Sequence, residues 1–167
     1  MILVDLPKQK PITTLEMEVA LMHYLNVRVN LIVPNLSWGL INYEADIVSL
    51  TKSGYATEIE IKISKSDLKA DFKKRIQHNS NYFKYFYYAV PLDMKDFALD
   101  IIPERAGLFV VRRRDDERVL KVIKVRDAKE NPMHKKWSDK DRMKLAELGC
   151  MRILGLKRKL INKGDNI

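Results

Sequence analysis

A short alternation of charged and apolar side chains places the strongest constraint on how this chain can fold. In residues 55–63, Tyr-Ala-Thr-Glu-Ile-Glu-Ile-Lys-Ile, the charged residues Glu58, Glu60 and Lys62 alternate with isoleucines. Alternate residues of a β-strand project to opposite faces. We therefore predict a strand with a buried apolar face and a face carrying two carboxylates and an ammonium. Such a charged face needs a function or an ion-pairing partner.

A second strand with an acidic residue precedes this one. Residues 43–50, Tyr-Glu-Ala-Asp-Ile-Val-Ser-Leu, are mainly apolar and include Asp46. The connecting residues 51–54, Thr-Lys-Ser-Gly, have the composition of a hairpin loop. Antiparallel pairing across this loop is expected to bring Asp46 beside Glu60 and Lys62.

Length and composition favour one soluble domain in the cytoplasm. The chain has 167 residues, of which 46% are apolar and 32% charged. It contains no run near the roughly 20 apolar residues of a membrane helix, and its start lacks the features of a secretory signal. The single Cys150 forms no intrachain disulfide and provides no thiolate cluster. This fits a reducing compartment and argues against redox chemistry.

The net charge of +9 is distributed unevenly. Residues 1–64 contain five Lys/Arg and seven Asp/Glu, whereas residues 65–167 contain 26 and 15. The acidic part is the part that contains the two charged strands. A local group of carboxylates in a basic protein suits a metal-dependent enzyme acting on a polyanion, because basic residues attract phosphates and carboxylates hold the cation. A charge excess that only improves solubility is the alternative.

The order of the remaining elements predicts an α/β fold with a mixed sheet flanked by helices. Thr13 and Glu16 form a capping box for a first helix that ends near Leu25. Ser64 is expected to cap a second helix. The other expected elements are a strand at 27–33 ended by Pro34, a loop at 35–39, a helix at 64–77, an aromatic strand at 82–91, a short helix at 97–101, a hairpin of 107–111 and 118–125 across Asp115 and Asp116, and a long helix at 138–161.

Glu18 lies within the predicted apolar side of the first helix. That side is formed by Leu15, Met17, Val19, Leu21, Met22 and Leu25. An ionised Glu on a buried face costs several kcal/mol unless it is paired, hydrogen-bonded or bound to metal. Glu18 is therefore a candidate site residue, and the alternative is a side chain at the margin that reaches water along its methylenes. Glu16 and His23 fall on the polar side and are expected to be solvated.

Glu18, Asp46 and the run Glu60-Ile61-Lys62 together resemble the PD-(D/E)XK phosphodiesterase superfamily, which has the restriction-endonuclease fold. The longer pattern of 43–46, 58–62, 66–74 and 87–91 is similar to the MmcB-like DNA-repair family within it. The resemblance covers about residues 14–112, and the final helix falls outside it. Ala45 stands where the superfamily name has proline.

The resemblance implies a restriction-endonuclease-like mixed sheet flanked by helices. The expected organisation is a single domain over residues 1–167, with a nuclease-like core at about 12–126 and a C-terminal helical extension at about 138–162.

The charged face suits phosphodiester hydrolysis in DNA with Mg²⁺ or Mn²⁺. Such hydrolysis requires charge neutralisation and a nucleophilic water, both of which a divalent cation promotes. Mg²⁺ prefers oxygen ligands, and we predict Asp46 and Glu60. By resemblance, the Ile61 carbonyl adds a third oxygen, Lys62 orients or activates the water, and Glu18 supports the metal directly or through water. Without metal the carboxylates repel one another, so one should have a raised pKa.

The expected function is a metal-dependent nuclease acting on DNA in repair, recombination or a phage-related process. The alternative function is a catalytically silent nuclease-fold protein that binds DNA or a repair partner. For the strand face itself, the alternative is a structural ladder in which Lys62 neutralises its neighbours across strands. Glu58 and Glu44 share these faces and are given secondary roles.

The predicted DNA contacts lie on either side of the charged strands. Lys65, Lys69, Lys73 and Lys74 follow the third strand and either contact phosphates or form a solvated helix face. Trp38, in the loop before the Asp46 strand, is the aromatic residue most expected to touch substrate. Arg112–Arg114 are either a clamp or a solubilising end. DNA is the expected partner, a homodimer and a repair-protein partner are further options, and no membrane is involved.

Overall fold

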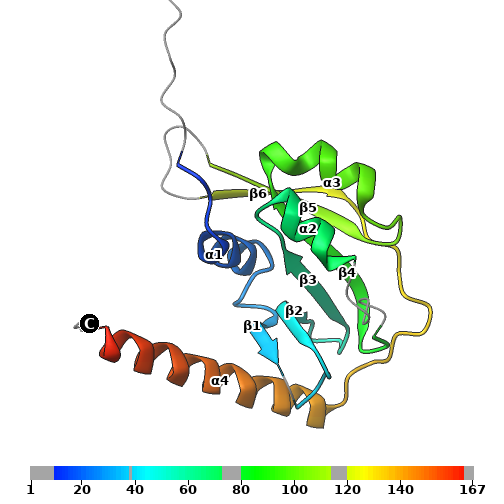
Figure 1. Cartoon of the computed structure of the whole chain (residues 1–167). Coiled ribbons are helices and arrows are strands. Elements are labelled where there is room, and N and C mark those ends of the chain that lie inside the picture. Colours follow the sequence, from blue (N-terminus) through cyan, green and yellow to red (C-terminus); the bar gives the residue numbers. More distant parts are fainter. Residues whose placement is uncertain (1–9, 38, 73–79, 114–119, 164–167) are drawn as a thin grey trace, which may run out of the picture.

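Six strands pair in their order along the chain to form one mixed sheet (Figure 1). The computed structural model describes residues 10–37, 39–72, 80–113 and 120–163. The elements are α1 (Thr14–Tyr24), β1 (Leu31–Ser37), β2 (Glu44–Leu50), β3 (Ala56–Ile61), α2 (Lys65–Asp71), β4 (Phe83–Pro91), the 3₁₀ helix η1 (Leu92–Met94), α3 (Lys95–Ile101), β5 (Gly107–Arg113), β6 (Leu120–Arg126) and α4 (Asp139–Asn162).

The sheet combines antiparallel ends with a parallel centre. β1, β2 and β3 pair antiparallel, β3, β4 and β5 pair parallel, and β5 and β6 pair antiparallel. The two parallel connections contain α2 and α3. The predicted α/β fold with a mixed sheet flanked by helices is confirmed, and the arrangement is consistent with a restriction-endonuclease-like fold. The carboxyl ends of the three parallel strands therefore lie at one edge of the sheet.

The helices cover both faces of the sheet (Figure 1). α1 packs against Ile59 and Ile61 of β3 through Met17 and Leu21. The opposite face, which includes Tyr88 of β4, is covered by α2 and α3. Because alternate strand residues point to opposite faces, the charged residues of β3 point away from α1.

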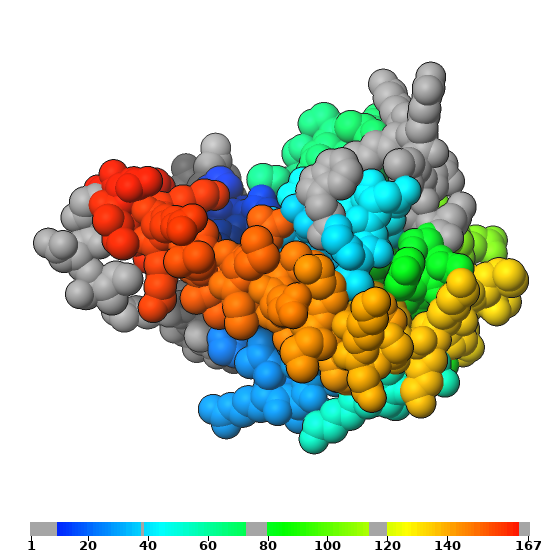
Figure 2. All heavy atoms as spheres, turned by 90° about the horizontal axis from the view of Figure 1, so that it is seen from below, coloured from blue at the N-terminus to red at the C-terminus, as the bar shows by residue number. Residues whose placement is uncertain are grey.

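The long helix α4 packs along the β1–β2 end of the sheet. Leu145 of α4 is completely buried in a cluster with Val33 and Val48. Figure 1 shows α4 running beneath β1 and β2, and Figure 2 shows it crossing that side of the molecule. Its C-terminal half exposes large apolar side chains, namely Met151, Ile153, Leu154, Leu156, Leu160 and Ile161.

The predicted helix starts are confirmed by their caps. The Thr13 hydroxyl accepts from the Glu16 N–H, and the Glu16 carboxylate accepts from the Thr13 N–H. Ser64 caps α2, and Ser138 caps α4. Each cap satisfies backbone N–H groups that have no partner within the helix.

The predicted apolar side of α1 is wrong at two positions. Leu15 is 65% and Val19 46% exposed, whereas Met17, Ala20 and Leu21 are buried. The helix contacts the sheet only along the side that carries Met17 and Leu21, so an apolar residue on the other side meets solvent. The sequence shows which residues of the helix are apolar, but it does not show how much of the helix surface contacts the sheet.

The predicted first strand is displaced along the sequence. Residues 27–33 were expected, but β1 is Leu31–Ser37 and includes Pro34. Asn26 instead begins a turn, in which its carbonyl accepts from the N–H groups of Val29 and Asn30. Pro34 is tolerated because β1 is an edge strand, where a missing N–H donor costs little.

Two other predicted boundaries differ in smaller ways. The second helix was expected to reach residue 77; the described helix ends at Asp71, and residues 73–77 lie outside the described ranges. The short helix begins at Lys95, two residues earlier than predicted. The predicted hairpin of β5 and β6 is confirmed, although its turn at 115–116 lies outside the described residues.

Candidate active site

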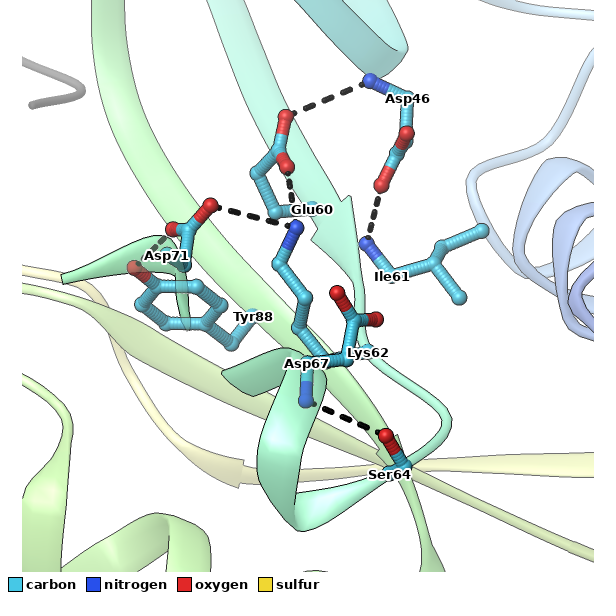
Figure 3. Close-up of polar contacts among 8 residues, drawn as sticks. All are labelled: Asp46, Glu60, Ile61, Lys62, Ser64, Asp67, Asp71 and Tyr88. Carbon is cyan, nitrogen blue, oxygen red and sulfur yellow. Dashed lines mark hydrogen bonds and ion pairs between the residues drawn. The ribbon is translucent and has the colours of Figure 1, made fainter. Parts of the chain in front are cut away.

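The candidate site forms where regular pairing between β2 and β3 ends. The last regular pair is Ile47 with Ile59. Beyond it, the Asp46 N–H donates to Oε1 of Glu60 at 3.4 Å, and Oδ2 of Asp46 accepts from the Ile61 N–H at 2.7 Å. Two carboxylates thus take up backbone donors that a continued ladder would pair (Figure 3). The predicted proximity of Asp46 and Glu60 follows directly from this register.

Lys62 is buried beside Glu60 rather than exposed. Its Nζ lies 2.8 Å from Oε2 of Glu60 and 3.3 Å from Oδ1 of Asp71. Only 5% of Lys62 and 2% of Glu60 are exposed. Burial alone lowers the pKa of Lys62, but the carboxylates of Glu60, Asp71 and Asp46 outweigh it and raise the pKa above its usual value. The side chain therefore remains an ammonium at neutral pH.

Asp71 is a site residue that the sequence prediction did not assign. It lies at the end of α2, is 3% exposed, and is the second carboxylate that pairs with the Lys62 ammonium (Figure 3). The Tyr88 hydroxyl of β4 donates to its Oδ2 at 2.7 Å. Burial, together with the charge of Asp71, raises the pKa of Tyr88, so Tyr88 stays a donor. The sequence contains a pattern that could have identified Asp71. This residue follows the predicted core residue Leu68 by three positions, which places both side chains on one side of the helix.

Glu18 lies near Asp46 and is half-buried. Its Oε2 accepts from the side-chain amide of Asn35 at 2.7 Å. Burial raises the pKa of Glu18, the hydrogen bond from Asn35 opposes this, and the negative charge of Asp46 raises it further. Glu18 is therefore a predicted site carboxylate with a raised pKa. We expected repulsion between carboxylates to cause such a shift, but the burial of Glu18 is the larger cause.

Glu58 is completely buried on the same face of β3, next to the site. Its Oε2 accepts from the Tyr43 hydroxyl at 2.9 Å. Burial first, and then the charge of Glu58, raise the pKa of Tyr43. The pair is thus a neutral donor hydrogen-bonded to an acidic side chain. Glu44, by contrast, is exposed.

Oxygen donors suitable for a hard cation are present, but they are not gathered around one point. Within the described ranges, no group of three or more His, Cys, Asp or Glu side chains is arranged to hold a metal ion. Asp46 is engaged by the Ile61 N–H, and Glu60 by Lys62. The donor set fits Mg²⁺ in its chemistry, and the cation site at Asp46, Glu60, Glu18 and the Ile61 carbonyl stays a prediction.

The predicted DNA-contacting lysines lie partly outside the described residues. Lys65 and Lys69 are exposed, and their Nζ atoms lie 5.1 and 5.4 Å from the centre of the Phe97 ring of α3. Both are thus on the α3 side of α2. Lys73, Lys74 and Trp38 lie outside the described residues.

Comparison with known proteins identifies relatives of this chain. A family model described as "DNA repair protein MmcB-like" matches residues 11–158. The chain belongs to the MmcB-like family. A search of curated proteins found no match. Among solved structures, the chain is similar to the SPO1766 protein of unknown function from Silicibacter pomeroyi, with 18% identity, a TM-score of 0.60, and coverage of 96% of this chain and 97% of that one. At this identity the likeness concerns the fold alone.

The MmcB-like match corrects the expected extent of the resemblance. We expected it to end near residue 112 and to exclude the final helix, but the match includes most of α4. The reason is that the start of α4 belongs to the core, since Leu145 is fully buried and the Trp137 indole donates to the Tyr82 carbonyl at 2.6 Å. None of the helices in the described part of the chain has the length and apolar content needed to cross a membrane.

Proposed function

We propose that this member of the MmcB-like family is a Mg²⁺- or Mn²⁺-dependent nuclease of the PD-(D/E)XK superfamily that hydrolyses phosphodiester bonds in DNA. The family description supports a role in DNA repair, and within this proposal DNA is the substrate and repair, recombination or a phage-related process is the setting. The observation that carries the proposal is the pair of hydrogen bonds that Asp46 makes with β3. Its N–H donates to the Glu60 carboxylate, its own carboxylate accepts from the Ile61 N–H, and Lys62 follows directly. We place the activity in the cytoplasm, in keeping with the single Cys150.

The proposed ligands are the carboxylates of Asp46 and Glu60, the Ile61 carbonyl and Glu18. A divalent cation bound there would polarise the scissile phosphate and lower the pKa of a bound water. In the present arrangement Glu60 is held by Lys62, so cation binding competes with the Lys62 ion pair. Loading with a cation should therefore weaken that pair and free the ammonium for the substrate.

Lys62 acts in this proposal as a charged hydrogen-bond donor. Its ammonium, once released from Glu60, would donate to a phosphate oxygen or to the attacking water. A charged donor in a buried site offsets negative charge that develops on the phosphate. Asp71 also positions Lys62, and the Tyr88 hydroxyl in turn holds Asp71.

The second candidate function is a nuclease-fold protein that binds DNA or a repair partner without cutting. One observation favours it: Lys62 already pairs with both Glu60 and Asp71, so the charged face has an ion-pair partner within the protein. Such a buried ion pair can have a purely structural role. A nuclease assay separates the two functions.

The assay uses the purified full-length chain with labelled single-stranded, duplex, nicked and branched DNA, in Mg²⁺, Mn²⁺ or a chelator. We expect cation-dependent cleavage that Asp46→Asn reduces by about 100-fold or more, since it removes one proposed ligand at constant size. The matched control is Glu44→Gln, an exposed position on the same strand, which should retain full activity.

Lys62→Ala is a second inactivating variant, accompanied by a folding check. Tight DNA binding with no cleavage on any substrate would overturn the nuclease and support the binding protein. Cleavage that persists in Asp46→Asn would overturn the assigned site.

A further inference from the structure

A groove lies at the carboxyl ends of the parallel strands, next to the candidate site and outside it. It encloses about 400 Å³ and is lined by the ends of β4 and β5, by Ile63 and by residues that lead into α1. Ile63 directly follows Lys62 in the chain, so the groove borders the end of the segment that carries Glu60 and Lys62. The carboxyl edge of parallel strands is a common place for ligands in open α/β sheets.

The charge of the groove favours an anion. Lys10, Arg112 and Arg113 line it with three positive charges, and Asp93 contributes one negative charge. Glu16, from the adjacent helix, pairs with Arg113 at 2.8 Å. The excess of positive charge therefore rests mainly on Lys10 and Arg112.

Both arginines have hydrogen-bonding capacity left over. The Nε atoms of Arg112 and Arg113 are buried and find no acceptor within the described part of the chain. A buried donor without an acceptor is unfavourable, so each of these N–H groups would gain from an anion bound in the groove. Guanidinium groups match phosphate oxygens in geometry and charge.

We propose that this groove binds the DNA backbone beside the scissile phosphate, with Arg112 contacting a phosphodiester of the same strand. The inference rests on the proposed function for the identity of the ligand, and it assigns a role to the basic run at the end of β5. Arg113 is held by Glu16, two residues before Glu18 on α1. The same helix thus contributes to the groove and to the candidate site, which keeps the two in a fixed relation.

The test measures binding without cleavage. The full-length chain is titrated with a short fluorescent single-stranded DNA in a chelator, at several NaCl concentrations, and followed by anisotropy. Arg112→Gln should weaken binding severalfold and reduce the steepness of log K against log [salt] by about 0.7, the value for one lost phosphate contact on a single strand.

Two further variants act as controls. Arg112→Lys keeps the charge and loses the planar guanidinium, so it should keep the salt dependence of the parent and bind with an affinity between those of the parent and Arg112→Gln. Lys135→Gln removes the same charge from an exposed residue whose N–H donates to the Asn81 carbonyl, near the other end of β4. It should leave affinity and salt dependence unchanged. Circular dichroism confirms that each variant is folded.

The outcomes separate this inference from the proposed function. Equal weakening in Arg112→Gln and Lys135→Gln, or no weakening in either, overturns the groove, as does a parent protein that does not bind DNA. Absence of cleavage in Mg²⁺ or Mn²⁺ overturns only the nuclease, because the groove is assayed without divalent cations.

Discussion

The Nζ atom of Lys62 lies 2.8 Å from Oε2 of Glu60, and both side chains are almost completely buried. Removing two charges from water is costly, and only close pairing with further hydrogen bonds compensates for it. Here Asp71 provides a second carboxylate, and Tyr88 donates a hydrogen bond to Asp71. One group of contacts therefore connects β3, α2 and β4, and the same residues that are proposed to act on DNA also stabilise the sheet.

Lys62→Met should lower the free energy of unfolding by about 3 kcal/mol, because it leaves buried carboxylates without their ammonium partner. The measurement is urea denaturation at neutral pH. Lys65→Met is the control, since Lys65 is exposed and should change stability by about 0.5 kcal/mol or less. Equal stability of the two variants would contradict the described ion pairs. This prediction explains why Lys62→Ala requires a folding check in the nuclease assay.

Tyr88→Phe should cost about 1 to 3 kcal/mol of stability. The substitution keeps the ring in the core and removes only the hydroxyl that donates to Asp71 at 2.7 Å. Hydrogen bonds to charged acceptors contribute more than neutral ones. Tyr24→Phe, at a residue that is 46% exposed, should be close to neutral in the same urea experiment. If both variants unfold at the same urea concentration as the parent, Tyr88 does not support Asp71.

The Glu16 carboxylate should make a contribution to the stability of the fold that is lost at acidic pH. Hydrogen bonds from Arg113 and Thr13 lower the pKa of Glu16 from its usual 4.5 to about 2. Because the folded pKa lies below the unfolded one, the stabilisation is present above about pH 4.5 and is lost as the pH falls toward 2. Glu16→Gln should thus melt at a lower temperature than the parent at pH 7, and the difference should shrink below pH 4.5.

Thermal melts across this pH range test the Glu16 prediction. Glu147→Gln serves as the control, because Glu147 is an exposed α4 carboxylate with one lysine at 3.4 Å. A difference between Glu16→Gln and the parent that stays constant down to pH 2 would show that the Arg113 pair is not its source.

Gly107 at the start of β5 should tolerate no side chain. A Cβ there would meet the ring of Tyr87 and the backbone nitrogen of Ala128. Tyr87 stacks on Phe109 at 4.4 Å between ring centres, so it has little freedom to move away. We expect Gly107→Ala to destabilise the protein by about 1 to 3 kcal/mol.

Gly155→Ala is the matched comparison for Gly107→Ala. Gly155 lies within α4, and a methyl group added there would meet no described atom within 4 Å. Alanine should stabilise the helix there by up to about 1 kcal/mol. The two variants should therefore shift the urea midpoint in opposite directions, and a shift in the same direction would contradict the packing at Gly107.

The proximity of Asp46 to Glu60 could be predicted because it depends on local rules. A two-residue period sets the face of each strand, and a short hairpin loop sets the register between them. The helix caps at Thr13, Ser64 and Ser138 were predictable for the same reason, since each depends on residues within four positions. These features form a large part of the fold near the site.

Features that depend on distant packing could not be predicted in this way. Asp71 reaches Lys62 only because α2 packs on the sheet face that includes Tyr88, and the sequence does not give the position of that packing. Likewise, the first strand was predicted to end before Pro34, because proline is disfavoured in the inner strands of a sheet. The local sequence does not show that β1 is an edge strand. The buried state of Lys62 has the same origin, because its partners come from different elements.

The position of Pro34 in β1 also bears on how copies of this chain can associate. β1 is an outer strand of the sheet, and a proline within it removes a backbone donor from the ladder. α4 packs against this strand as well. A second molecule that added a strand at this edge would therefore find the row of backbone N–H donors interrupted at Pro34. It would also find α4 packed against β1. Self-association through a continuous intermolecular sheet at this edge is disfavoured, which protects an exposed strand end from aggregation.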